Sequence, residues 1–221
     1  MKTRIIHTLL FGALLLVTAC AQNLLVAPEA TKTTRLTARM EFQPETKTVL
    51  SEQVGNMYYP LWTDQDSLSV FTETGQTPVA FTLFSGVGDT NAIFEGPRSG
   101  ERYVALFPFN PQARWEGNML SFSLPEEQSY RANSFAVDGF PMIAVSETAD
   151  LQFKNLCSVI RLSLTGSGVV GSITLHSDSQ FLSGPASVDL TYGESPVLVM
   201  GDGGSHDVRL ECGAVMLNTI D

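Results

Sequence analysis

One of the three cysteines in this chain stands in a sequence that gives its thiol a reaction. Residues 16–20 read LVTAC, an aliphatic residue and two small residues placed before Cys20. This is the lipobox pattern, in which the thiol accepts a diacylglyceryl group and the small residues let the backbone enter the lipoprotein peptidase. The sequence therefore predicts that Cys20 becomes the lipid-bearing N-terminus of the mature protein.

The residues before Cys20 have the order of an export signal. Lys2 and Arg4 supply a positive start, and a mostly apolar run follows over residues 5–17. The run is shorter than the ~20 apolar residues that span a bilayer, and its layout is that of a signal peptide rather than a membrane helix. We interpret residues 1–20 as a lipoprotein signal; an ordinary signal peptide with a chance cysteine is the alternative.

A lipid at Cys20 would fix the compartment of the protein. Two acyl chains suffice for stable membrane attachment, and no other segment is long and apolar enough to span a bilayer. We therefore expect a lipid-anchored protein of the outer membrane, at the cell surface or in a fimbrium. Residues 21–34 have no clear period and contain Pro28, which favours a tether.

Catalytic and metal-binding patterns are weak in the rest of the chain. His206 lies in the run Ser205-His206-Asp207, but triad partners meet through the fold from separate elements, so a polar loop is the better interpretation. His176 ends an alternating segment and is expected at a strand rim. Asp64 and Asp66 lack the glycine and distant glutamate of a calcium loop and indicate a turn. The sequence predicts no enzyme activity, no cofactor and no metal site.

Composition narrows the class of partner. Loss of Lys2 and Arg4 with the signal moves the formal net charge from −10 to −12, and no basic face for nucleic acid is visible.

Beyond Cys20, only Cys157 and Cys212 remain. Export permits a disulfide between them, but two free, buried thiols are the slightly favoured interpretation.

The body of the chain is patterned for short strands. Apolar and polar residues alternate in segments separated by clusters rich in glycine, proline and serine, which is typical of an all-β sandwich. Residues 129–137 are the best candidate for one or two helical turns. The predicted strands are 36–42, 67–71, 79–84, 92–94, 102–107, 119–122, 142–145, 158–164, 171–176, 186–191 and 207–212.

Aromatic residues offer the best alternative to a purely structural role. Trp62 and Trp115, with Tyr103, could line a platform for a sugar ring. Large aromatic side chains more often close a sandwich core, and we weight the core interpretation higher.

Several stretches, taken in order, resemble the fimbrillin family of surface lipoproteins from Bacteroidetes. They are the lipobox at Cys20, the tryptophan, acidic turn and strand at 62–71, the aromatic-proline strand at 102–109, and the block at 151–162 with 173–175 and 182–184. The similarity covers about residues 35–215. The chain has Gln65-Asp66 where the family commonly has Gly-Asp.

The resemblance implies a fold and a domain plan. Family members have two transthyretin-like antiparallel β-sandwich domains. Residues 35–148 would form the first sandwich, and residues 149–221 would start a second one, which we expect to be incomplete in this chain.

The resemblance also implies a mode of assembly. Family members are structural subunits or anchors of surface fimbriae, and their partners are other fimbrial subunits. A protease removes the first strand, and a strand of a neighbouring subunit replaces it. Here that strand is 36–42, and the link for trimming is 44–48 with Lys47; Arg35 and Arg39 lie before or within the strand. The alternative function is a surface lipoprotein that binds glycans or host ligands.

Overall fold

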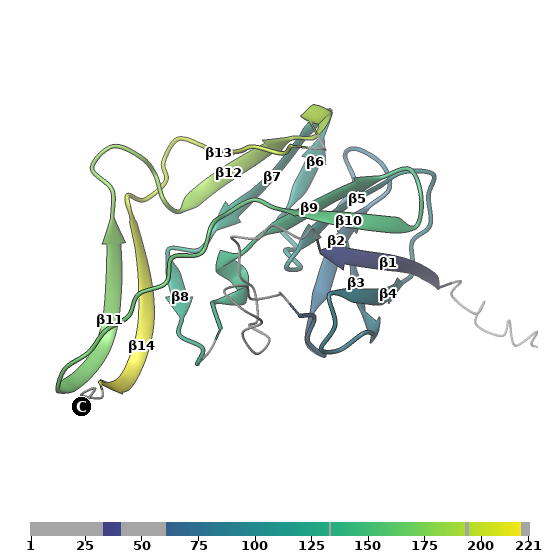
Figure 1. Ribbon diagram of the computed structural model, residues 1–221. Coiled ribbons are helices and arrows are strands. Elements are labelled where there is room, and N and C mark those ends of the chain that lie inside the picture. The colour runs from purple at the N-terminus through teal and green to yellow at the C-terminus, as the bar shows by residue number, and fades with distance from the viewer. Residues whose placement is uncertain (1–32, 41–60, 133, 193–194, 218–221) are drawn as a thin grey trace, which may run out of the picture. The chain divides into compact units, whose positions relative to one another are not determined.

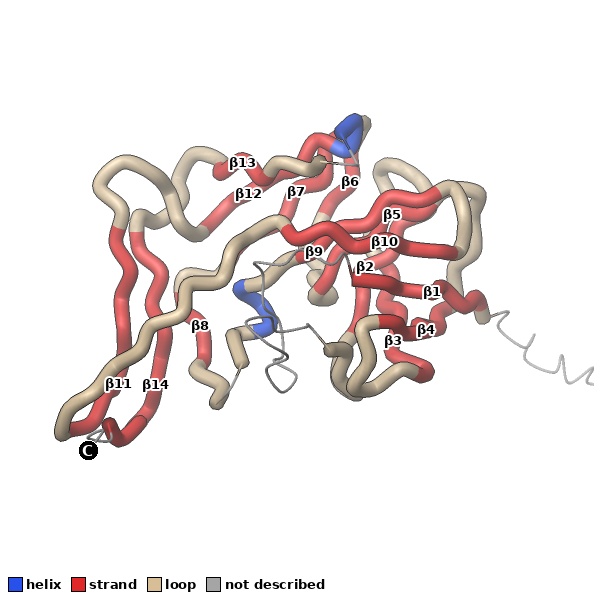
Figure 2. Tube along the Cα trace, in the orientation of Figure 1, coloured by secondary structure: helices blue, strands red, loops and turns tan. Residues whose placement is uncertain are grey.

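The computed structural model describes residues 33–40, 61–132, 134–192 and 195–217, and these residues form an all-β structure (Figures 1 and 2). The chain divides into two compact units, Met1–Thr31 and Lys32–Asp221, and the described residues belong to the second. The only helical elements in the described ranges are two short 3-10 turns, η1 (Val137–Gly139) and η2 (Leu190–Tyr192). The predicted all-β fold class is therefore confirmed.

Seven strands form a sheet that closes on itself in the order β1-β10-β9-β5-β2-β3-β4. Their inward side chains form a core around Trp62, whose ring meets those of Phe94, Phe107 and Phe153 edge-on at centroid distances of 4.9, 5.3 and 5.7 Å. The strands are β1 (Thr34–Met40), β2 (Ser67–Phe71), β3 (Val79–Ser85), β4 (Asn91–Gly96), β5 (Tyr103–Phe107), β9 (Met142–Ser146) and β10 (Asp150–Asn155).

A second sheet packs against the outer face of the closed one. Its order is β13-β12-β7-β6, from β6 (Arg114–Glu116), β7 (Met119–Leu124), β12 (Gly184–Asp189) and β13 (Leu198–Met200). All five residues of β5 are buried, because Tyr103, Ala105 and Phe107 enter the first core while Val104 and Leu106 enter a second core with Trp115 and Leu120. A strand buried on both faces has an unbroken apolar sequence, as 103–107 has. The two sheets form a sandwich in which β5 of the closed sheet contributes side chains to both cores.

Strand pairing runs across the domain boundary expected at 148/149. β10 begins at Asp150, yet it pairs parallel to β1 and antiparallel to β9. β12 likewise pairs antiparallel to β7, along Gly184–Leu124 to Asp189–Met119. The first strand after the expected boundary is therefore a member of the closed sheet.

A third sheet has the order β11-β14-β8, formed by β11 (Gly168–His176), β14 (Asp207–Leu217) and β8 (Glu127–Ser129). The helical turns expected at 129–137 are wrong: Ser129 pairs with Glu211 of β14, and in this region only Val137 to Gly139 is helical. A strand partner distant in sequence overrides a local helical pattern.

The strand expected at 158–164 is also wrong. These residues form a loop that runs from β10 to β11 without folding back (Figure 2). Alternation fixes which side chains share a face, but a strand also needs a neighbour for its backbone hydrogen bonds. No described strand pairs with this segment.

Candidate functional site

β1 occupies a special place because it closes the seven-stranded sheet. It pairs parallel with β10 on one side and antiparallel with β4 on the other, from Thr34–Gly96 to Arg39–Asn91. In Figure 1, β1 lies between β10 and β4. Removal of β1 would leave two strands with unpaired backbone groups.

The side chains of β1 alternate between the core and solvent. Leu36 and Ala38 are fully buried in the first core, while Arg35 and Arg39 are exposed. This alternation of buried and exposed side chains is expected for a half-buried strand. A strand that replaced β1 would need apolar side chains at the two positions of Leu36 and Ala38.

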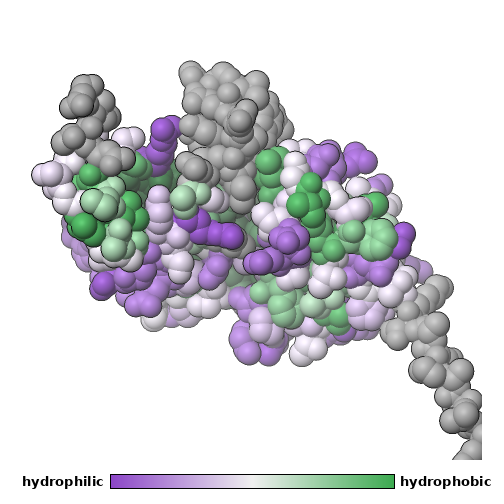
Figure 3. Space-filling view, turned by 90° about the horizontal axis from the view of Figure 1, so that it is seen from below, coloured by the Kyte–Doolittle hydropathy of each residue, from purple (hydrophilic) through white to green (hydrophobic). Residues whose placement is uncertain are grey.

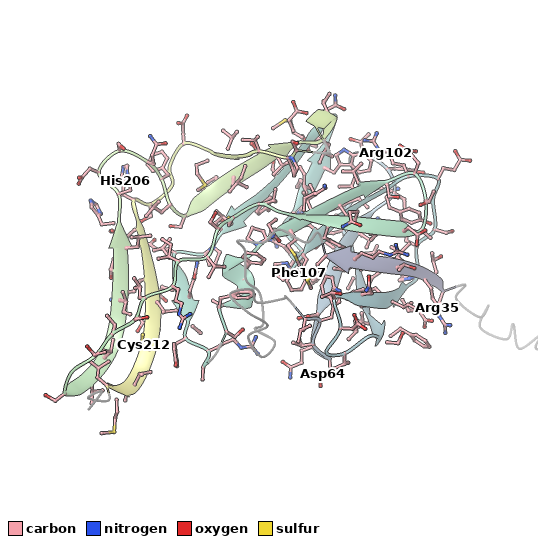
Figure 4. All side chains as sticks on the ribbon, viewed as in Figure 1. Arg35, Asp64, Arg102, Phe107, His206 and Cys212 are labelled. Atoms are coloured by element: carbon pink, nitrogen blue, oxygen red, sulfur yellow. The ribbon has the colours of Figure 1, made fainter. Side chains whose placement is uncertain are left out.

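Arg35 fastens β1 to its antiparallel neighbour. Its Nε donates to Glu95 Oε2 at 2.8 Å, and its guanidinium carbon lies 3.8 Å from the centre of the Phe84 ring. Glu95 and Arg35 are direct partners in the β1–β4 register. Figure 4 shows Arg35 near the N-terminal end of β1.

The other predicted site residues fall elsewhere. The lipid-attachment residue Cys20 and the trimming residue Lys47 lie outside the described residues, as does the link 44–48. Arg35 and Arg39 lie inside β1, so their peptide bonds belong to a paired strand rather than to an exposed link.

The loop 158–164 and the third sheet together carry an exposed apolar surface. Ile160, Leu162 and Leu164 alternate along the loop 158–164 and are 63, 56 and 49 % exposed. With Ile173 of β11 and Leu210 of β14 they line a cavity of about 490 Å³. Figure 3 shows hydrophobic residues gathered over β11 and β14. We call these five residues the open apolar face.

The aromatic platform, the less favoured interpretation of these rings, is wrong. Trp62 is 1 % exposed, while Trp115 and Tyr103 are each 5 % exposed. Trp62 lies in the first core, and Trp115 packs on Phe71 in the second, where its Nε1 donates to Gly117 O at 2.8 Å. The preferred core interpretation of these rings is confirmed, and none of them can stack on a sugar.

The acidic pair Asp64 and Asp66 forms a turn, as expected. Asp66 is buried, and its Oδ2 accepts the Thr63 N–H at 2.7 Å. Burial raises the pKa of Asp66, while the hydrogen bonds with Thr63 act in the opposite direction. The carboxylate caps the turn that leads into β2.

The two histidines of the body lie together at one end of the third sheet. The expectation of His176 at a strand rim is confirmed, since it ends β11 with an exposed side chain. It pairs with Asp207 across the β11–β14 register, while His206 stands beside Asp207 in the chain. The sequence showed His206 next to Asp207 but gave no sign of the β11–β14 register that brings His176 to the same place.

Cys157 and Cys212 are free thiols, which confirms that part of the favoured interpretation, but both are half-buried rather than buried. Burial raises the pKa of Cys157 to about 11.

Comparison of the chain with protein-family models, curated proteins and solved structures gave no match. Within the part of the chain that the structure describes, no helix has the length and apolar character needed to cross a membrane.

Proposed function

We propose that this chain is a fimbrillin-like, lipid-anchored and non-enzymatic subunit or anchor of cell-surface fimbriae, and that it assembles with like subunits by β-strand addition. The order of motifs from the lipobox to 182–184 supports the family. The observation that carries the assembly mode is the position of β1, a single strand whose backbone closes the sheet between β4 and β10.

The position of β1 offers an incoming strand both backbone hydrogen bonds and side-chain pockets. An emptied position would offer backbone donors and acceptors on β4 and β10 and two small apolar pockets, left by Leu36 and Ala38. Backbone hydrogen bonds give affinity for an added strand, and alternate pockets select its side chains. An incoming strand with an aliphatic and a small residue two positions apart fits this demand.

The position of the arginines favours trimming after β1. A protease binds its substrate as an extended, unpaired strand, whereas Arg39 is paired with both β10 and β4 and Arg35 is paired with Glu95 of β4. Lys47 follows β1 in the sequence and is the remaining basic residue of the link. Trimming at Lys47 would free β1 and the lipid together, while an untrimmed subunit would stay on the membrane as an anchor.

The test replaces residues 44–48 with the recognition sequence of a specific protease. The full chain is cut and mixed with a biotinylated peptide of residues 34–40, and incorporation is followed on native gels. We expect the peptide to enter the cut protein and to be excluded from the uncut one.

The matched control is the same peptide with Leu36→Asp and Ala38→Asp, which keeps the backbone but cannot fill the apolar pockets. Equal incorporation of both peptides would contradict selection by the pockets. Absence of incorporation and of polymers after complete cutting would contradict strand addition at β1.

A further inference from the structure

His176 lies between two carboxylates at the end of the β11–β14 strand pair. Its Nδ1 lies 2.7 Å from Asp207 Oδ1, and its Nε2 lies 3.4 Å from Asp178 Oδ1. All three side chains are accessible to solvent, and Asp178 is fully exposed. A ligand can therefore reach the Nε2 side of the ring.

The second histidine, His206, lies beside His176. His206 Nδ1 lies 2.9 Å from the carbonyl oxygen of Gln180, and the His206 ring packs on Phe181 at a centroid distance of 4.8 Å. The ring centres of His206 and His176 are 6.4 Å apart. Figure 4 shows His206 near the C-terminal end of β11.

Hydrogen bonding fixes which nitrogen of each ring is available. A carbonyl oxygen and a carboxylate only accept, so each Nδ1 must carry the proton that it donates. A neutral ring then has its lone pair on Nε2. In His176 that lone pair faces an oxygen of Asp178 at 3.4 Å, an arrangement that calls for a cation between them.

The backbone around the cluster is tied down by hydrogen bonds. Ser183 Oγ donates to Asp207 O at 2.9 Å, and Asp207 N donates to Ser205 Oγ at 3.1 Å. Ser177 N donates to His206 O at 3.0 Å, and Ser177 Oγ accepts Gln180 N–H at 3.1 Å. Both turns that carry the ligating side chains are thus held in place before any ligand arrives.

We propose that His176 Nε2 and Asp178 bind a divalent transition cation such as Zn²⁺, with His206 Nε2 as the third ligand and water completing the shell. Ligand bonds of about 2.1 Å at a tetrahedral angle place neighbouring ligand atoms about 3.4 Å apart, and the distance from His176 Nε2 to Asp178 Oδ1 is 3.4 Å. Asp207 and Gln180 O take the outer positions that orient metal-bound histidines.

The third ligand requires a small movement. No group of three or more such side chains already converges within the described residues. Two imidazoles on one tetrahedral zinc have ring centres about 5 Å apart, against 6.4 Å for His176 and His206. The half-buried His206 ring therefore has to approach His176 by about 1.4 Å, with a shift against Phe181 and Gln180 O.

The test is calorimetric titration of the tag-free full chain with ZnCl₂ at neutral pH, with nuclear magnetic resonance of the histidine rings. We expect one Zn²⁺ per chain and perturbation of both Nε2 signals. His176→Ala should abolish binding, and Asp207→Asn should weaken it by about 10–100-fold, the usual effect of losing an outer hydrogen-bond acceptor.

Asp178→Asn removes a proposed ligand and should also weaken Zn²⁺ binding. It is the variant with the least risk to folding, because that side chain is fully exposed. The control is Asp189→Asn, an exposed carboxylate that caps Thr191 outside the cluster. Binding that survives His176→Ala, or equal loss in the control, would overturn the proposal. So would a flat titration in which the His176 ring responds to pH alone, because a proton would then be the cation between the two side chains.

Discussion

At the scale of single residues, Asp66 shows how burial and capping compete. Asp66 is 8 % exposed as a residue, its carboxylate accepts the Thr63 N–H, and its backbone oxygen accepts Leu83 N–H at 3.3 Å. A buried charge is destabilising unless its partners replace water. Because burial is the larger effect on the pKa of Asp66, the ionised form is less favourable in the fold than in water.

A stability difference that depends on pH follows for Asp66. The folded state keeps the proton at pH values where the unfolded state has lost it, so the free energy of unfolding falls as pH rises from the ordinary aspartate pKa through the raised one. Asp66→Asn removes this fall and keeps an acceptor for Thr63. We expect the variant to match or exceed the parent at pH 7 in urea denaturation, and Asp66→Ala to lose about 1 kcal/mol.

Asp89 is the matched control for that experiment, because its pKa shifts the other way. Hydrogen bonding from the Asn91 backbone lowers the pKa of this exposed carboxyl. Its contribution to stability is therefore present above the ordinary aspartate pKa and is lost as pH falls through the lowered one. Parallel pH profiles for Asp66→Asn and Asp89→Asn would contradict the opposite environments of the two groups.

Cys157 is expected to be a protected thiol. Burial raises its pKa to about 11 from an ordinary value of 9.0, which leaves about 100-fold less thiolate near pH 8, and the thiolate is the reactive form. Alkylation by iodoacetamide, followed by mass spectrometry, should be at least that much slower in the folded protein than in urea. Equal rates in the two states would show that Cys157 is not buried.

At the scale of elements, the hold of Arg35 on β1 predicts a difference between two arginines of one strand. Arg35 and Arg39 share the outer face of β1, but Arg35 has the ion pair with Glu95 and the contact with Phe84. Arg35→Ala should destabilise β1 by about 0.5–1 kcal/mol, and Arg39→Ala should stay within about 0.5 kcal/mol. Amide hydrogen exchange of the β1 backbone measures the destabilisation in each variant. Equal exchange rates in the two variants would contradict a stabilising role of Arg35 on β1.

The elements also show what periodicity can and cannot predict. Alternation located most strands within one or two residues, and 67–71 coincides with β2. It failed at 158–164, where alternation is present and no described strand pairs with the segment, and at 129–137, where β14 recruits Ser129. Pairing with a distant segment, as in the parallel β1–β10 contact, leaves no local trace in the sequence.

The candidate sites follow the same rule. Burial of Trp62 and Trp115 could be predicted from their size, and the first strand from its alternation. The junction between β4 and β10 and the meeting of His176 with Asp207 both depend on strand order and register. Strand order and register are properties of the folded sheet. The sequence therefore identifies the individual residues of these sites but not the residues that they meet.

At the scale of the whole described unit, the strand β5 predicts cooperative unfolding because its side chains enter both cores. Phe153 lies in the first core and Leu120 in the second, and both are fully buried. Because β5 belongs to both cores, Phe153→Ala and Leu120→Ala should each cost about 2–5 kcal/mol and shift one common transition. Calorimetry with tryptophan fluorescence tests this. Two separate transitions would favour independent domains divided near 148/149.

The lipid prediction concerns the whole molecule and its place in the cell. If Cys20 is the lipid-bearing residue, Cys20→Ser removes the only group that can accept the diacylglyceryl chain in the run 16–20. Before trimming, the parent protein should partition into the detergent phase and gain the mass of its acyl chains. The variant should lose both properties, because each buried CH₂ contributes about 0.8 kcal/mol of membrane attachment. Lys47→Ala is the control that blocks trimming but keeps the lipid, and identical fractionation of all three proteins would contradict the anchor.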